Sequence, residues 1–193
     1  MGYKVISGIS NKHLHLSEAD LEALFGAGAK LTPYKALVQP DQYAAEEKVD
    51  IVGPKATLKG IRILGPTRPQ SQVEISMTDA RTLGVEAPVC ESGKLAGTPG
   101  VKLVGPAGEI DLPEGLIIAL RHIHLSPAGA EKAGLKNKDI VDVQTFGSRP
   151  LIFQDVLIRS GDAHLDEFHV DTDEANAAGM ENGQEIEIIS GPK

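Results

Sequence analysis

One short motif occurs twice in this chain and constrains its fold more than any other feature. Residues 11–17 and 120–126 align without a gap, with a basic residue, a His, an aliphatic residue, a second His, Leu and Ser in the same order. The two histidine pairs are His13 with His15 and His122 with His124. A motif of this length that recurs within one chain indicates an internal duplication, so we expect a fold built from repeated units.

Two further segments follow the same frame. Four positions hold a side chain that can bind metal, and each lies two residues before a residue that starts helices well. These pairs are His15 with Ser17, Glu74 with Ser76, His124 with Ser126, and His169 with Asp171. The pattern predicts four short helices, each ending at a glycine in the left-handed conformation. The glycines are Gly26, Gly84, Gly134 and Gly179.

The remaining sequence alternates between β-like segments and turns. With 21 Gly and 12 Pro among 193 residues, many short elements are favoured over long helices. The expected strands are 49–52, 56–64, 101–104, 108–112, 115–119, 140–145 and 151–158. The predicted fold class is therefore mainly β, with two small β-barrels capped by short α-helices and built from pseudo-repeated strand-helix-strand units. Residues 27–48 have no equivalent in the other copies and are interpreted as an inserted flap.

Charge and cysteine content exclude several classes of protein. The net charge of −8 is opposite to that of proteins that bind nucleic acid or an anionic membrane. The single Cys90 excludes an internal disulfide and fits a reducing compartment, and the first residues lack the apolar core of a signal peptide. We therefore expect a cytoplasmic protein; a homo-oligomer is compatible with the sequence. Cys90 is interpreted as a small buried hydrophobe rather than a nucleophile.

The histidine pairs predict metal binding. On a strand, residues i and i+2 point to the same face about 6.5 Å apart, so both imidazoles of a pair can face one site. Histidine and carboxylate ligands without cysteine are typical of Zn²⁺. The candidate ligands are His13, His15, Glu74, His122, His124 and His169. The alternative for Glu74 is a plain exposed carboxylate, and His164, which lies outside all four frames, is assigned no role.

The same positions also favour the binding of an anion. Each ligand candidate precedes a helix N-terminus, where free N–H groups attract negative charge. Phosphate is the natural candidate, and Arg68 lies in a turn-rich segment shortly before Glu74, where its guanidinium can bind phosphate through two nitrogens. Arg159 is a second candidate, with a surface ion pair as the alternative. The chain has neither a P-loop nor a G-x-S-x-G motif, which disfavours covalent serine catalysis.

Taken together, these motifs resemble the PduL-type phosphate acyltransferases (phosphotransacylases), some of which work inside bacterial microcompartments. The resemblance rests on residues 10–17, 68–76, 121–126 and 168–171. It implies two barrels, one formed by 1–11 with 120–193 and one by 12–119, so that the N-terminal strand joins the C-terminal half. It also implies a two-zinc site between the barrels. One zinc, which also takes the coenzyme A sulfur, is held by His13 and His15, and the other by Glu74, His122, His124 and His169.

The resemblance implies further site residues. Arg68 matches the phosphate-contacting arginine, and polar active-site positions match Gln39, Gln42, Gln72, Ser92 and Arg159. Two of them, Gln39 and Gln42, lie in the flap, which covers the site in the family. Members inside microcompartments usually carry an N-terminal amphipathic extension, whereas the first strand here is expected almost at Met1. Either the enzyme is free in the cytoplasm, without association with a shell, or the sequence is a shortened one.

The expected function is reversible transfer of an acetyl or propanoyl group between coenzyme A and inorganic phosphate. Transfer is expected to be direct, without an acyl-enzyme, at a site that contains two zinc ions. Two alternatives stay open at this point. A dizinc hydrolase can use the same ligands to activate water, and a metal-binding barrel without enzymatic activity needs no open coordination position.

Overall fold

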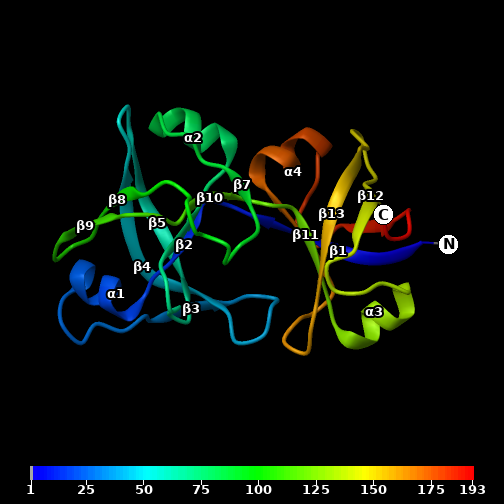
Figure 1. Cartoon of the computed structure of the whole chain (residues 1–193), viewed down its shortest axis with the longest axis horizontal. Coiled ribbons are helices and arrows are strands. Elements are labelled where there is room, and N and C mark those ends of the chain that lie inside the picture. The colour runs from blue at the N-terminus through cyan, green and yellow to red at the C-terminus, as the bar shows by residue number, and fades with distance from the viewer. Residues whose placement is uncertain (1) are drawn as a thin grey trace. The chain divides into compact units, whose positions relative to one another are not determined.

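A computed structural model describes residues 2–193 and divides them into two units, each with its own hydrophobic core. Unit 1 comprises residues 2–10 and 120–193, and unit 2 comprises Asn11–Ala119. Strands predominate in both units, and the four helices are short, as predicted for a mainly β fold (Figure 1). The helices are α1 (Glu18–Phe25), α2 (Met77–Leu83), α3 (Pro127–Ala133) and α4 (Thr172–Ala178).

Unit 1 is a closed six-stranded barrel with the strand order β1-β14-β11-β13-β12-β15. Strand β1 pairs in parallel with β14 and antiparallel with β15, so the first strand of the chain completes a barrel made by the last third. In Figure 1, α3 and α4 lie at opposite ends of this barrel. Its strands are β1 (Tyr3–Ser10), β11 (His122–Leu125), β12 (Ile140–Gln144), β13 (Ile152–Ser160), β14 (Glu167–Asp171) and β15 (Glu185–Ile188).

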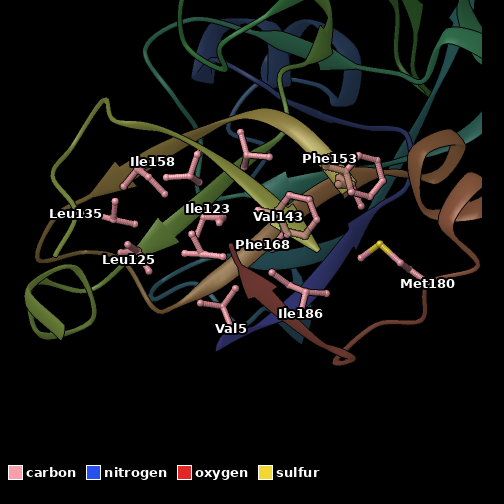
Figure 2. Packing of buried hydrophobic residues seen from close by; sticks show 14 of the residues in the cluster. Val5, Ile123, Leu125, Leu135, Val143, Phe153, Ile158, Phe168, Met180 and Ile186 are labelled. Atoms are coloured by element: carbon pink, nitrogen blue, oxygen red, sulfur yellow. The ribbon is translucent and has the colours of Figure 1, made fainter. Parts of the chain in front are cut away.

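The core of unit 1 explains which way its histidines point. Ile123, Leu125 and Phe168 are fully buried in the hydrophobic cluster inside the barrel (Figure 2). Because side chains alternate along a strand, His122 and His124 point to the other face of β11. These two histidines are also buried, so β11 has an apolar face inside the barrel and a second covered face that carries imidazoles.

Unit 2 is a nine-stranded sheet in which eight strands follow the order β7-β10-β6-β2-β5-β4-β8-β9, and the ninth, β3, pairs with β4. The two barrels expected from the sequence are thus one closed barrel and one sheet that stays open among the described residues. The two edge strands, β7 and β9, each pair with one neighbour, β10 and β8 respectively. The strands are β2 (His13–His15), β3 (Pro33–Ala36), β4 (Tyr43–Val52), β5 (Thr57–Gly65), β6 (Gln72–Glu74), β7 (Val89–Cys90), β8 (Val101–Val104), β9 (Glu109–Leu112) and β10 (Leu116–Ala119).

The predicted helix starts are confirmed at all four helices, and the predicted left-handed glycine stops at three of them. Each N-cap side chain accepts a hydrogen bond from the backbone N–H three residues later, which satisfies a donor that the helix itself leaves free. Three helices end at a left-handed glycine. The exception is Gly26, whose φ of 102° is combined with an extended ψ of 158°.

The duplication is visible in the strand pairing. In unit 2, β2 pairs antiparallel with β6 and in parallel with β5. In unit 1, β11 pairs in the same two ways with β14 and β13. The basic residue before each histidine pair also forms an ion pair with the acidic third residue of a helix. Lys12 lies 3.0 Å from Asp79 of α2, and Arg121 lies 2.7 Å from Glu174 of α4. The two units therefore repeat one strand arrangement around each histidine pair.

The segment 27–48, interpreted as a flap, forms a hairpin of β3 and the first part of β4. Strand β3 is exposed along its whole length, whereas Gln39 in the connection is buried. Among residues 2–193, no helix has the length and apolar character needed to cross a bilayer.

Candidate functional site

The first candidate metal centre, here called the His13 cluster, consists of His13, His15 and Glu74 in unit 2. Their ligand atoms all lie within 4.8 Å of one another. Strand pairing places His13 directly opposite Glu74, with 3.5 Å between Nε2 and Oε2. Nδ1 of His13 lies 2.8 Å from the Asn11 carbonyl oxygen, and Nδ1 of His15 lies 3.1 Å from that of Leu64. These carbonyls hold the Nδ1–H groups and leave both Nε2 atoms for a metal.

The second candidate metal centre, here called the His122 cluster, consists of His122, His124 and His169 in unit 1. Their ligand atoms also lie within 4.8 Å of one another, and their ring centroids are 4.7 to 5.0 Å apart. Nδ1 of His122 lies 2.8 Å from the Leu120 carbonyl oxygen, which repeats the contact of His13 in unit 2. The repeated motif thus orients its first histidine by the same backbone contact in both units.

Unpaired ring nitrogens show that the His122 cluster fits a metal. Both ring nitrogens of His124 and Nε2 of His169 are buried without a hydrogen-bond partner. A buried polar atom without a partner costs free energy, and a bound cation removes that cost. Two clusters of nitrogen and oxygen donors without cysteine match the ligand preference of Zn²⁺.

Burial keeps three of these imidazoles, His15, His122 and His124, in the uncharged form that binds metal. Burial lowers the pKa of His122 to about 3, and nearby His169 adds to the effect. Burial also lowers the pKa of His15 and His124 well below the ordinary value of a histidine. Near neutral pH these rings are uncharged and offer a lone pair to a cation.

The ligand set implied by the resemblance assigned Glu74 to the zinc held by the histidines of unit 1, and that assignment stays an expectation. Within unit 2, the carboxylate of Glu74 lies beside His13. The physical reason is the pairing of β2 with β6, which puts Glu74 directly across from His13. The His13 cluster therefore has a carboxylate of its own.

Gln72 and Ser92 form a hydrogen-bond network around Glu74. The Gln72 side-chain amide donates to Glu74 Oε1 and to Ser92 Oγ, the latter at 2.8 Å, and Ser92 Oγ donates to Glu74 Oε1 at 3.1 Å. The backbone N–H of Gly93 donates to Gln72 Oε1 at 2.8 Å, which fixes the orientation of the amide. Both residues were expected as active-site positions, and in this structure their contacts orient the Glu74 carboxylate.

A pocket of about 200 Å³ lies beside His15 in unit 2. It brings together two residues predicted from the sequence, Arg68 and Gln42, and its wall also includes Asp41. The positive charge of Arg68 contributes to the low pKa of His15. Gln39, three residues before Gln42, does not line this pocket and is buried in the same connection. The pocket therefore places a guanidinium next to a candidate metal ligand.

The His122 cluster has two neighbours outside the predicted ligand set. Arg159 on β13 is in register with His124 on β11, and its charge contributes to the low pKa of His122 and His124. The ring of His164 stacks on that of His124, with centroids 4.1 Å apart and planes inclined by 10°. His164 was assigned no role from the sequence because it lies outside all four repeated frames.

Cys90 is half-buried on β7 rather than fully buried as expected. Its Sγ lies 2.8 Å from the Lys94 carbonyl oxygen, to which the thiol donates.

Comparisons with known proteins agree on one family. A family model described as phosphate propanoyltransferase matches residues 6–181. The chain is 55% identical to the phosphate propanoyltransferase of Thermotoga maritima over 186 residues, which cover 96% of this chain and 89% of the relative. It is 53% identical to that of Salmonella typhimurium over 188 residues, with the same two coverages. For the enzyme of Rhodopseudomonas palustris, the identity is 46% over 186 residues, which cover 96% of this chain and 82% of the relative.

Proposed function

The chain belongs to the phosphate propanoyltransferase family of acyltransferases, and on this basis we propose that it transfers a short acyl group directly between coenzyme A and phosphate with two zinc ions. The phosphate oxygen attacks the thioester carbonyl carbon. A C–O bond forms, the C–S bond breaks, and coenzyme A leaves as a thiolate. Acetyl and propanoyl are the two acyl groups proposed. No protein nucleophile is needed because both substrates react in one complex.

The two clusters support the zinc part of the proposal. Each offers three ligand atoms within 4.8 Å, which leaves a coordination position for a substrate. Zinc held there would supply Lewis acidity, at the His13 cluster for the sulfur of coenzyme A and at the His122 cluster for the oxygens of phosphate. The backbone carbonyls at Nδ1 of His13 and His122 hold the rings in the tautomer that this binding requires.

The pocket beside His15 is the main observation in support of the proposal, because its lining can bind the phosphate substrate. Arg68 lines it together with Gln42 and a ligand of the His13 cluster. A guanidinium can donate two parallel hydrogen bonds to a phosphate, and Gln42 adds a neutral donor. We propose that Arg68 binds the phosphate group of phosphate or acyl phosphate, with Gln39 and Gln42 as further substrate-binding residues and Arg159 as a further catalytic residue.

The other functions considered from the sequence do not account for the family. A dizinc hydrolase and a metal-binding barrel without activity both explain the histidine pairs, but they give no reason for relatives that carry the name of an acyltransferase. Location in the cytoplasm stays a prediction.

Metal content and activity, measured on the same preparation, test the proposed function. Protein purified without chelators is expected to contain two zinc ions per chain and to convert acetyl-CoA or propanoyl-CoA with phosphate into acyl phosphate and free coenzyme A. Removing the metal is expected to abolish the reaction, and adding Zn²⁺ back is expected to restore it. Hydrolysis of the thioester without dependence on phosphate, or one zinc ion or fewer per chain together with full activity, contradicts the proposal.

Replacing Cys90 by alanine is expected to retain most of the activity. The reason is that direct transfer places no acyl group on the protein, and Cys90 donates to the carbonyl of Lys94 instead. Initial rates with varied coenzyme A and acyl phosphate check this, and intersecting lines are expected for a reaction through a ternary complex. Parallel lines, with acyl-Cys90 detected after mixing with acetyl phosphate alone, contradict direct transfer.

A further inference from the structure

In both units, the residue before the first histidine of the repeated motif is basic and forms an ion pair. Lys12 Nζ lies 3.0 Å from Oδ1 of Asp79, a buried carboxylate. In unit 1, Arg121 lies 2.7 Å from Oε1 of Glu174. Each acid is the third residue of the helix that follows the strand opposite the histidine pair. Neither ion pair belongs to the two ligand clusters or to the pocket wall, so the proposed chemistry does not account for them.

The acid of the first ion pair is itself held in place. Asp79 Oδ2 accepts the backbone N–H of Ser76 at 3.3 Å, and Ser76 Oγ accepts that of Asp79 at 3.2 Å. These reciprocal bonds form a capping box at the start of α2. The carboxylate is thereby fixed at the helix start, two residues after the end of β6, and offers Lys12 an anchor with a set position.

The backbone at Lys12 makes the contact that orients His13. The peptide group before Lys12 contributes the carbonyl oxygen of Asn11, which lies 2.8 Å from Nδ1 of His13. A carbonyl oxygen only accepts, so this contact places the proton of the ring on Nδ1 and leaves Nε2 for a metal. In unit 1, the carbonyl of Leu120 makes the same contact with His122. An anchored side chain at the basic residue therefore restrains the carbonyl next to it.

We propose that Lys12 and Arg121 are positioning residues for the two candidate metal centres, each acting through the carbonyl before it on the first histidine of its own cluster. The inference rests on the two zinc sites of the proposed function. Each ion pair ties the start of the histidine strand to the helix after the opposing strand. Without that anchor the peptide can turn, and the ring presents its nitrogens to the metal in more than one orientation. Arg121 is fixed further, because Nε and Nη2 donate to the Gln154 carbonyl oxygen at 3.0 and 2.7 Å.

Zinc affinity of one cluster at a time tests the inference without an activity assay. Full-length protein with His122→Ala and His124→Ala keeps the His13 cluster and serves as the first parent. Competition with a chromophoric chelator measures its dissociation constant for Zn²⁺. Adding Lys12→Met is expected to raise that constant about 10-fold. Lys12→Arg keeps the charge and is expected to restore most of the affinity.

Two further variants of the first parent separate the ion pair from general effects. Asp79→Asn removes the other charge but keeps a side-chain oxygen for the N–H of Ser76, so it also serves if Lys12→Met fails to fold. Its effect is expected to equal that of Lys12→Met, and the double variant is expected to lose no more than either single one. The matched control is Lys102→Met, which removes a lysine from β8 of the same unit, where it pairs with Glu109 at 2.7 Å. It is expected to leave the affinity unchanged.

A second parent, with His13→Ala and His15→Ala, keeps the His122 cluster. In this parent, Arg121→Met is expected to raise the dissociation constant about 10-fold and Lys12→Met to leave it unchanged. In the first parent, Arg121→Met is expected to have no effect. This crossed result separates the positioning of one ring from a general loss of structure, which would weaken both clusters.

Long-range ¹H–¹⁵N spectra of the metal-free protein test the geometry directly. His13 and His122 are expected to carry their proton on Nδ1, and Lys12→Met is expected to mix the two tautomers of His13 alone. Zinc affinities that neither substitution changes, or equal weakening of both clusters by one substitution, overturn the inference while zinc binding stands. Parents that bind no zinc contradict the proposed function itself, so the two failures are distinguishable.

Discussion

Replacing His13 by alanine is expected to lower the zinc content from two ions per chain to one and to reduce kcat at least 10²-fold. Three ligand atoms converge in the His13 cluster, and the substitution leaves only His15 and Glu74. Two ligands hold zinc weakly because structural and catalytic sites use at least three protein ligands. Loss of this ion removes the proposed partner of the coenzyme A sulfur. Metal analysis and steady-state rates on the same preparation check both effects.

The matched control for His13→Ala is His122→Ala, because His122 is the equivalent residue of the other unit. Each variant is expected to lose the zinc of its own cluster and to keep the other, since the two ligand sets share no residue. Selective spectra of Co²⁺ bound to each variant distinguish the two remaining sites. If His13→Ala loses both ions, or loses neither, the division into two independent clusters is wrong.

Replacing Arg68 by alanine is expected to lower kcat/KM for phosphate and acyl phosphate about 10- to 100-fold, with little change in the KM for coenzyme A. A hydrogen bond to a charged group contributes about 1.5 to 3 kcal/mol, which corresponds to that range. The pocket places Arg68 beside His15, so its guanidinium is a charged donor next to a candidate metal ligand. Rates measured with each substrate varied in turn check the expectation.

Two companion variants sharpen the test of Arg68. Arg68→Lys keeps the charge but loses the planar pair of donors, so it is expected to recover only part of the loss. Arg81→Ala removes the same charge from the exposed end of α2 and is expected to leave phosphate kinetics unchanged. A rise in the KM for coenzyme A, with unchanged kinetics for phosphate, assigns Arg68 to the other substrate and contradicts the proposal.

Local signals account for what the sequence predicted well. The N-caps and glycine stops of the four helices act within a few residues, so their outcome depends little on the rest of the chain. The two histidine pairs lie on strands for a similar reason, because alternation along β11 places Ile123 in the core and His122 and His124 on the opposite face. The joining of the N-terminal strand to the C-terminal half was expected from the family resemblance; in the structure, β1 pairs with β14 and β15.

Contacts between distant segments account for what sequence analysis missed. The carboxylate beside His13 is supplied by β6, and only the register of the β2–β6 pair decides that Glu74 lies there. His164 reaches His124 from a loop, where no period relates position to direction.

By itself, the sequence of this protein determined the repeated frames, the helix limits, the mainly β class and the set of residues able to bind metal. Each of these follows from the order of side chains over short distances, where backbone geometry repeats every two or every three to four residues. Only the tertiary structure decided that one sheet closes and the other stays open, which carboxylate joins which histidines, and that Arg68 and Gln42 share a pocket with His15. Those outcomes depend on strand register and on packing between segments far apart in the chain, where a shift of one residue turns every side chain to the opposite face.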